Sequence, residues 1–561
     1  MKKIIALLLV LVMSLALFSG CEEPEYVSHR RPQKEKVTEP ISMEELIPPL
    51  EEDAEVLTFR YEEKHADAYY QKLEEYKQAA MDNDREKIDS LDLELNELDL
   101  FILDQATIAE VLHYCNTKDE DASQLYLDMT DVVADITDAN LETMREIYNS
   151  DCELKDYIFE GWTQEDIDYM LAYTEEVKEV QKREAELLVE YREFSEKEKE
   201  KETGKIYAEI ASNSNRVAEN YGYDNYYEYA YEVIRARDYS MQEIKQLRTY
   251  AKDYLLDIYD RVIRSFAERR QNLTQEQMAE LQSFLYDDYD ENAYLDDYLD
   301  ALPLEMSSDM RTMFDGNVIF PKSSKAREGA FTTLISNKPF CYFSKDYRNS
   351  STLVHEMGHY YGGIHGDLMN MPLDLAEVQS QGNEWLMIVY TAQEMDDDVF
   401  KCYLDYRFLN DLSVILISVI IDEFEERVYT SEDLENFDTE DFEQIMEEVC
   451  EEYGGIELFT DYLNIDIQSY WREVVLESQV YYISYAVSMV PSLDIYFCAS
   501  EDWEKALEIY QTVTMDITGD DTFLGILEEA GLASPFEIDL YAKLMEHYDM
   551  QIPDYDRGKA A

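Results

Sequence analysis

The sequence predicts a mainly α-helical protein of two lobes that carries one small β-sheet. Its 561 residues exceed what one hydrophobic core usually organises, and an apolar content of 46% is ample to fill two. Between Ser42 and Asp315, apolar residues recur at helical spacing and glycines are rare. Between Val318 and Phe343, apolar and aromatic runs are instead broken by Gly, Pro and Asn, which predicts the sheet.

Residues 1–20 indicate a secretory signal, because two lysines precede an apolar run from Ile4 to Phe18. The run is short for a membrane-spanning helix. Small residues directly before Cys21 resemble a bacterial lipobox, where cleavage leaves a lipidated N-terminal cysteine. We therefore expect an extracytoplasmic lipoprotein of the bacterial cell membrane, anchored by lipidation of Cys21. A plain signal peptide and an uncleaved anchor are the alternatives.

Residues 21–41 are polar and charged and contain three prolines, which predicts a disordered tether. The folded body follows it. We expect an N-terminal helical lobe over residues 42–204 and a catalytic lobe over residues 205–561. The boundary is set at the highly charged stretch from Glu196 to Lys205.

Several helix starts carry the S/T-x-x-E/Q capping box, in which two side chains satisfy free amides of the first turn. Ser240 with Glu243 and Thr274 with Gln277 fit this pattern. After Ser240, apolar residues at spacings of three and four define one buried helix face, formed by Leu247, Ala251, Tyr254, Ile258 and Val262. These features predict long amphipathic helices.

The formal net charge of -77 argues against a nucleic-acid partner, because phosphate binding requires clustered Lys and Arg. The charge can serve solubility alone. It can also attract cationic peptides and raise their rate of encounter. The sequence leaves both interpretations open.

The segment His-Glu-Met-Gly-His from His355 to His359 predicts a zinc site. Its two histidines are four apart, so on a helix both imidazoles project from one face and can bind one Zn2+. Glu356 lies beside the metal, where its carboxylate can act as general base on a bound water. Zinc lowers the pKa of that water to roughly 7, so the pattern predicts amide hydrolysis. His365 lies off the ligand face, where it can line the cleft.

A zinc ion needs a third protein ligand, and Glu377 is our candidate. It begins a second helical stretch, after a connection from Gly362 to Pro372. Two histidines and one glutamate leave the fourth position to water, which is the catalytic form of a zinc site. Asp374 and Glu384 can accept hydrogen bonds from the ligand imidazoles, or each is simply a solvated carboxylate.

The runs Val354–His359 and Ala376–Glu384 resemble the zinc core of the thimet oligopeptidase and oligoendopeptidase F family, zinc metallopeptidases of the gluzincin type. The resemblance extends from about Lys205 to Met550. Other segments similar to the family are Gly329-Ala330-Phe331 with Pro339-Phe340, Gly222 to Tyr226, Arg237 to Tyr239, and Thr522 to Phe536.

This resemblance implies a zincin-like, two-lobed helical oligopeptidase with a small sheet beside the zinc site. It implies a deep central channel that admits short peptides and excludes folded proteins. Gly329, Ala330 and Phe331 would form the strand whose edge pairs with an extended substrate. Tyr482 and Tyr485 would donate hydrogen bonds to the oxyanion, although a chain with 46 tyrosines also uses many in packing.

Three features depart from the family pattern. Gly362 stands where the family usually has a histidine, and the step of 18 residues from His359 to Glu377 is shorter than is common. The segment from Tyr470 to Gln479 lacks an expected histidine. These departures concern substrate alignment and rate, and the three zinc ligands are intact.

The sequence thus predicts a zinc-dependent metalloendopeptidase that hydrolyses internal bonds of short peptides outside the cytoplasm. One alternative is a dipeptidyl carboxypeptidase, which would need a cationic clamp for the terminal carboxylate of its substrate. Another is a peptide-binding lipoprotein on a zincin scaffold without catalysis, which would have no need of Glu356.

Overall fold

The computed structural model describes residues 42–48, 56–162, 164–172, 174–194, 196–285, 291–368, 370–455, 467–476 and 479–550. The predicted signal, the tether and Cys21 lie outside these residues. The chain divides into two compact units. The first comprises Met1–Tyr226 and Phe314–Lys345, and the second comprises Tyr227–Met313 and Asp346–Ala561.

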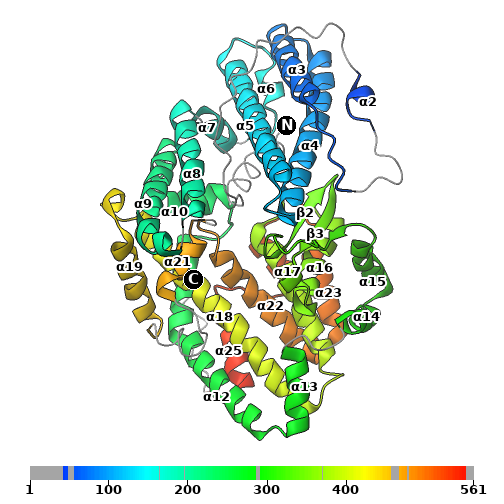
Figure 1. Cartoon of the computed structure of the whole chain (residues 1–561), viewed down its shortest axis with the longest axis vertical. Helices are drawn as coiled ribbons and strands as arrows, with labels where there is room; N and C mark the ends of the chain where they lie inside the picture. The colour runs from blue at the N-terminus through cyan, green and yellow to red at the C-terminus, as the bar shows by residue number, and fades with distance from the viewer. Residues whose placement is uncertain are drawn as a thin grey trace. The chain divides into compact units, whose positions relative to one another are not determined.

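The first unit begins with a run of helices (Figure 1). They are α2 (Met43–Leu46), α3 (Glu63–Met81), α4 (Arg85–Cys115), α5 (Glu120–Asn149), α6 (Lys155–Ile158), α7 (Gln164–Ala172), α8 (Glu175–Glu193) and α9 (Glu196–Asn220). The helices α3, α4 and α5 lie side by side and bury Tyr69, Leu98 and Val133 between them. Periodic apolar faces therefore assemble this unit, as the sequence predicts.

A small sheet completes the first unit. Its strands are β1 (Val318–Ile319), β2 (Ala330–Ile335) and β3 (Lys338–Phe343). Their order is β1-β3-β2, with β1 parallel and β2 antiparallel to β3. Ser336 and Asn337 both have positive φ, 53° and 57°, as a type I′ hairpin turn requires. The sheet predicted between Val318 and Phe343 is confirmed.

The second unit is helical. Its elements are η1 (Ala230–Ile234), α11 (Met241–Tyr250), η2 (Ala251–Leu255), α12 (Leu256–Asn272), α13 (Gln275–Leu285), α14 (Glu291–Ala301), α15 (Leu304–Arg311), α16 (Ser350–His365), α17 (Leu373–Thr391), α18 (Asp397–Tyr429), η5 (Leu434–Asn436), α19 (Thr439–Glu452), α21 (Ile467–Val474), α22 (Ile483–Glu501), α23 (Trp503–Thr514), α24 (Phe523–Ala530) and α25 (Asp539–His547). Three short elements span the limits between the units, namely α10 (Tyr226–Tyr229), η3 (Thr312–Phe314) and η4 (Lys345–Tyr347).

Both capping boxes predicted in this unit are present. Ser240 and Glu243 exchange side-chain and backbone hydrogen bonds at the start of α11. The backbone amide of Thr274 donates to Oε1 of Gln277 over 3.0 Å, and the amide of Gln277 donates back to Oγ1 of Thr274 over 3.2 Å. These local bonds satisfy first-turn amides, which is why the two helix starts could be predicted.

The helix after Ser240 differs from the prediction at one turn. The predicted face is buried at four positions, Leu247, Ala251, Ile258 and Val262. Tyr254 is only half-buried, and Leu255 is buried in its place. The reason is the π-helical turn η2, which holds more residues than an α turn and rotates the following side chains about the axis.

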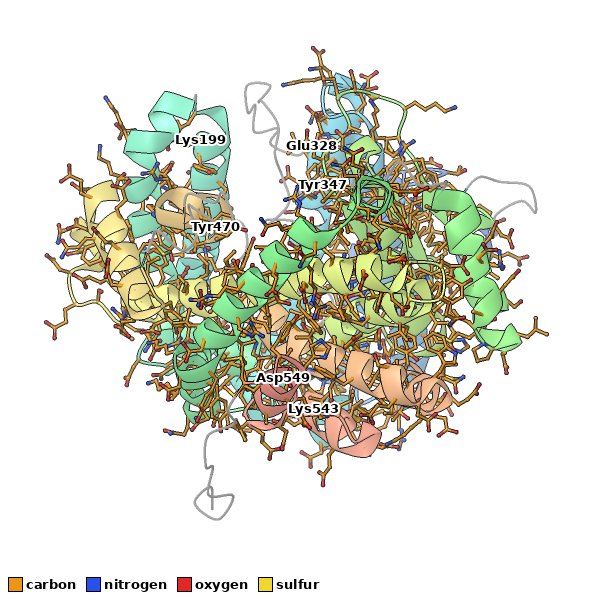
Figure 2. All side chains as sticks on the ribbon, turned by 90° about the horizontal axis from the view of Figure 1, so that it is seen from below. Lys199, Glu328, Tyr347, Tyr470, Lys543 and Asp549 are labelled. Carbon is orange, nitrogen blue, oxygen red and sulfur yellow. The ribbon has the colours of Figure 1, made fainter. Side chains whose placement is uncertain are left out.

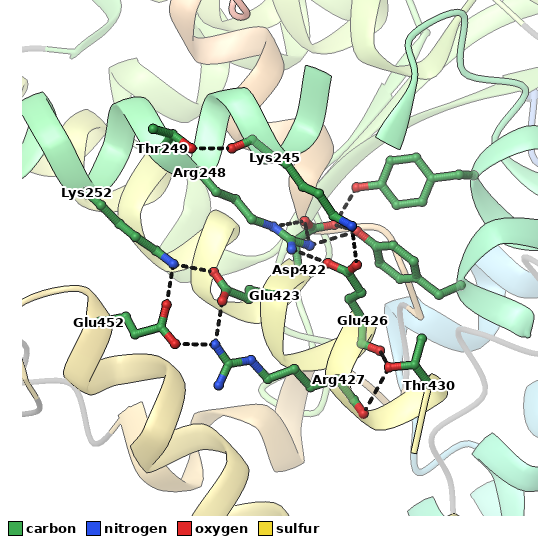
Figure 3. A network of polar contacts seen from close by, with 12 residues as sticks. Lys245, Arg248, Thr249, Lys252, Asp422, Glu423, Glu426, Arg427, Thr430 and Glu452 are labelled. Atoms are coloured by element: carbon green, nitrogen blue, oxygen red, sulfur yellow. Dashed lines mark hydrogen bonds and ion pairs between the residues drawn. The ribbon is translucent and has the colours of Figure 1, made fainter. Parts of the chain in front are cut away.

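A network of paired charges joins α11, η2, α18 and α19 (Figure 3). Arg248 donates through Nε to Oδ2 of Asp422 over 2.9 Å and also pairs with Glu426. We call the residues of these linked pairs the charge network, comprising Lys245, Arg248, Lys252, Asp422, Glu423, Glu426, Arg427 and Glu452. Opposite charges satisfy one another here, so the network fixes helix packing.

Three further observations concern predictions outside the site. The predicted limit between the lobes, at residue 204, falls inside α9 and stays a prediction. Across the described ranges, no helix is both long and apolar enough to cross a membrane. The six cysteines of this part of the chain are free thiols, at positions Cys115, Cys152, Cys341, Cys402, Cys450 and Cys498.

Candidate metal centre

The helix α16 carries the His355 to His359 segment. Asn349 caps its N-terminus by accepting a hydrogen bond from the backbone amide of Thr352, over 2.9 Å. The helix continues to His365, so the two predicted zinc ligands lie one turn apart on the same face. Their ring centroids are 5.0 Å apart.

Two glycines let α16 lie directly on α17. A Cβ atom at Gly358 would lie 2.5 Å from the backbone oxygen of Gln379, and one at Gly362 would overlap the side chain of the same glutamine. Asn383 of α17 also donates to the backbone oxygen of Val354 over 2.8 Å. This close contact brings the carboxylate of Glu377 to the histidine pair.

Three ligand atoms converge between these helices. Nε2 of His355 lies 3.7 Å from Oε2 of Glu377, and Nε2 of His359 lies 3.9 Å from the same oxygen. The three atoms all fall within 4.8 Å of one another. Two imidazoles and one carboxylate are a donor set that zinc accepts in catalytic sites, so these residues fit such an ion.

Glu384 holds His355 from the side opposite the convergence point. Nδ1 of His355 lies 2.9 Å from Oε1 of Glu384, whose Oε2 accepts from Ser351 at 2.5 Å and from Nη2 of Arg407 at 2.9 Å. Burial opposes a charge on His355, but the hydrogen bond and charge of Glu384 outweigh it and raise the pKa of His355 to about 9. This contact fixes the ring so that Nε2 faces Glu377.

His359 has the opposite electrostatic environment. Burial and the neighbouring charge of His355 lower the pKa of His359 to about 3. His359 is therefore neutral at physiological pH, which is the form of imidazole that binds a metal.

Glu377 is 6% exposed and is held by two hydroxyl groups. Tyr481 donates to its Oε1 over 3.2 Å, and Ser380 donates to its Oε2 over 3.3 Å. Burial raises the pKa of Glu377. Glu356 lies on α16 next to His355 and is 4% exposed, so the predicted base is also withdrawn from bulk water.

The comparison of the chain with known families agrees with this geometry. Residues 319–541, which include every one of these side chains, match the sequence model of peptidase family M3. This segment belongs to peptidase family M3. It is therefore the segment of a metallopeptidase. A search of curated protein sequences finds no significant match to the chain.

Solved structures share the fold of the M3 segment and of most of the rest of the chain. PZ peptidase A in complex with an inhibitor has 18% sequence identity, covers 88% of this chain and 98% of its own, and gives a TM-score of 0.68. A Bacillus anthracis protein assigned as oligoendopeptidase F has 16% sequence identity, covers 88% of this chain and 96% of its own, and gives a TM-score of 0.63. The oligoendopeptidase F of Enterococcus faecium has 14% sequence identity, covers 87% of this chain and 97% of its own, and gives a TM-score of 0.51.

The two predicted oxyanion donors occupy different surroundings in the M3 segment. The Tyr485 ring packs against those of Tyr481 and Tyr482, with centroids at 5.4 and 5.6 Å. The charge of Tyr481 and burial raise the pKa of Tyr485, and the carboxylates of Glu377 and Glu356 add to the shift. Tyr485 thus packs beside Tyr481, whose hydroxyl contacts the predicted ligand Glu377.

Tyr482 instead reaches α21. Its hydroxyl lies 3.4 Å from that of Tyr470, which Figure 2 labels. Tyr481, which helical spacing did not single out, donates a hydrogen bond to the predicted metal ligand Glu377. Both Tyr481 and Tyr482 precede α22, so the three-residue spacing of a helix face could not rank them.

Asp374 and His365 have partners other than the ligand imidazoles. Oδ2 of Asp374 accepts from the hydroxyl of Tyr239 over 2.8 Å and lies 3.8 Å from Nε of Arg237. Nε2 of His365 lies 2.9 Å from Oδ2 of Asp309. Glu384 supports the imidazole of His355, a predicted ligand, directly, whereas Asp374 anchors the first turn of the helix that carries Glu377.

The predicted substrate strand belongs to the first unit. Gly329 has φ of 130° and exchanges hydrogen bonds with Ser344, with distances of 3.0 and 2.9 Å. Ala330 and Phe331 begin β2, which pairs with β3 alone among the described strands. The free edge of β2 can accept another strand, but its role as a substrate strand and the channel implied by the family stay predictions.

Proposed function

We propose that this protein is a zinc-dependent endopeptidase that hydrolyses internal bonds of short peptides. The observation that carries the proposal is the convergence of His355, His359 and Glu377 in the M3 segment, with Glu356 buried beside them. The fold shared with PZ peptidase A and oligoendopeptidase F supports a substrate range of oligopeptides.

In this proposal His355, His359 and Glu377 hold one zinc ion. When bound, the ion supplies Lewis acidity, which polarises a peptide carbonyl and lowers the pKa of water to roughly 7. Glu384 keeps His355 in place, and Tyr481 keeps Glu377 in place, through the hydrogen bonds described above. Two features of the site fit such an ion. One is the set of donor atoms, and the other is the buried carboxylate of Glu377, whose negative charge burial disfavours and a cation would stabilise.

Glu356 acts as general base in this scheme. Its carboxylate accepts a proton from the attacking water and then returns it to the amide nitrogen of the leaving group. Withdrawal from bulk water strengthens its electrostatic interactions with the substrate. The proton therefore moves from water to Oε of Glu356, and from there to the departing amine.

Tyr485 stabilises the oxyanion. A phenol is protonated at neutral pH, and the pKa of Tyr485 is raised further, so its hydroxyl can donate a hydrogen bond to the carbonyl oxygen as charge develops there. A donor of this kind contributes about 3 kcal/mol to transition-state stabilisation. Tyr482 serves as a second donor in this proposal, and Gly329 to Phe331 pair with the substrate backbone.

We also propose that the protein works outside the cytoplasm, held at a bacterial membrane by a lipid on Cys21. The lipobox-like sequence supports this placement. Replacement by Cys21→Ser should release the protein from the membrane fraction of expressing cells. Mass analysis of the N-terminal peptide of the wild type should show a diacylated cysteine at position 21, and an unmodified peptide would refute the anchor.

A peptide-library digest read by mass spectrometry tests the enzymatic proposal. The zinc-loaded wild type should cut internal bonds and leave folded proteins intact, while the metal-stripped protein should be inactive until zinc is restored. Products that are all C-terminal dipeptides would assign a dipeptidyl carboxypeptidase. Equal inactivity of zinc-loaded and stripped protein on the whole library would favour a peptide-binding protein.

A further inference from the structure

The segment before α22 contains a residue in a strained conformation. Val480 has φ of 52°, in the left-handed region that β-branched residues strongly disfavour. Such a conformation is strained and persists only where the surrounding structure imposes it. The next residue is Tyr481, which contacts the metal ligand Glu377.

Two buried side chains hold Val480 through its backbone. Its amide donates to Oε1 of Glu425 over 2.7 Å, and its carbonyl oxygen accepts from Nη2 of Arg237 over 3.0 Å. The side chain of Arg237 is only 1% exposed, and Glu425 is also buried. The backbone amide and the carbonyl group of Val480 are therefore both held by side chains buried inside the second unit.

The preceding residue, Gln479, is held in the same manner. Its backbone oxygen accepts from Nη2 of Arg235 over 3.0 Å, and its side-chain oxygen accepts from Tyr429 over 3.2 Å. Ala236, between the two arginines, also has a positive φ, of 47°. The two arginines thus bind the adjacent carbonyl groups of residues 479 and 480. One of the two contacting segments contains Ala236 in the left-handed region, and the other contains Val480 there.

Arg237 reaches beyond Val480 to two helix starts. The same Nη2 donates to Oγ of Ser484 over 3.0 Å, in the first turn of α22. Nε lies 3.8 Å from Oδ2 of Asp374, in the first turn of α17 and one turn before Glu377. The guanidinium also covers the ring of Tyr231 at 4.3 Å. One side chain therefore links the helix of the third metal ligand to the tyrosine segment.

We propose that Arg237 is a positioning residue of the site: it holds Val480 in its left-handed conformation and thereby sets Tyr481 and Tyr485 against the metal ligands. Arginine suits this task because its planar fork presents several donors at fixed angles, whereas lysine presents one flexible ammonium group. The inference rests on the proposed peptidase function, and it adds to that function a structural cause for the placement of the tyrosines.

The experiment compares Arg237→Gln with Arg269→Gln in the zinc-loaded full chain. Arg269 is a matched control, because it also binds a backbone carbonyl, that of Lys401 at 3.0 Å, and a buried carboxylate, that of Asp405 at 3.4 Å. We would measure kcat and KM on a quenched peptide that the wild type cleaves, zinc content, and hydrogen exchange of residues 479–488.

Arg237→Gln should lower kcat about tenfold to a hundredfold with KM nearly unchanged, because misplaced groups lose transition-state contacts rather than substrate affinity. Zinc content should remain one ion, and amides of residues 479–488 should exchange faster. Arg269→Gln should resemble the wild type in kcat and in exchange of this segment. The same kcat and the same exchange in both variants would overturn the proposal.

A second variant and the exchange measurement cover two cases, namely an Arg237→Gln protein that does not fold and a wild type that cleaves no peptide. If Arg237→Gln does not fold, Arg237→Lys keeps the positive charge near Asp374 but loses the fork, and it should show the same changes at a smaller size. Wild-type kcat and exchange in that variant would overturn the proposal. If the wild type cleaves no peptide, the enzymatic function fails, and hydrogen exchange alone still decides whether Arg237 holds the segment.

Discussion

The metal centre and the charge network are both clusters of ionisable groups, and they differ in how their charges are arranged. In the charge network each carboxylate meets a guanidinium or an ammonium group, as Asp422 meets Arg248. In the metal centre the ligand atoms of two imidazoles and Glu377 instead converge on one point. Pairing stabilises helix contacts, whereas convergence creates a place for a cation. The two regions should therefore respond to mutation in different measurable quantities.

The largest expected effect is on catalysis. Glu356→Gln removes the proton acceptor and leaves the three metal ligands in place, so kcat should fall about a thousandfold while zinc content stays at one ion. Peptide cleavage and elemental analysis check this. The variant should unfold at the wild-type temperature within a few degrees. A kcat within tenfold of the wild type would remove Glu356 from the mechanism.

The charge network should respond in stability rather than in rate. Arg248→Gln leaves Asp422 buried without its guanidinium partner, which should lower the free energy of unfolding by about 3 kcal/mol or more. Denaturant titration checks this. Arg264→Gln is the control, because its pair with Asp260 is exposed and should contribute under about 1 kcal/mol. If Arg248→Gln instead abolished zinc binding, the contrast between the regions would fail.

Glu384 combines features of both clusters, because it pairs with Arg407 and also contacts His355, a predicted metal ligand. Glu384→Ala should weaken zinc affinity about tenfold to a hundredfold, since the ring of His355 loses its support. Competition with a chromogenic chelator measures this. Glu384→Gln retains a hydrogen-bond acceptor for the ring of His355, so its zinc affinity should fall less than that of Glu384→Ala. Equal zinc affinities in all three proteins would contradict the role of Glu384.

An effect confined to one pH range concerns Glu425, which lies on α18 next to the acidic residues of the network and binds the backbone amide of Val480 instead. Burial raises the pKa of Glu425 to about 8, from a usual 4.5. A raised folded-state pKa means that stability is lost as pH rises from about 4.5 to about 8. Glu425→Gln mimics the protonated acid, so it should flatten this decline while changing stability little at pH 5. Unfolding at pH 5, 7 and 8.5 tests the slope.

The sequence predicted those parts of the fold and site that depend on local geometry. His355 and His359 were predicted because four residues make one helical turn, and the helix starts at Ser240 and Thr274 because a capping box is a local contact. The π-helical turn η2 could not be foreseen, since no local pattern specifies it.

Long-range partners were beyond the reach of spacing arguments. Tyr481, Arg407 and Arg237 all support the metal centre, yet each lies far in sequence from the residue it contacts. The chain is rich in charged residues and tyrosines, so only their contacts in the folded structure single out these three. The family resemblance pointed to the tyrosine run but not to the residue within it that contacts Glu377.

The direct contact of α16 with α17 at Gly358 has a consequence for the kinetics of metal loading. Backbone that rests on backbone has no rotamers to exchange, so the spacing of the ligand atoms should vary little as side chains fluctuate. An incoming ion would then find its ligands already placed. The rate of zinc uptake should be limited by diffusion and ligand deprotonation, with the helices already in their final positions.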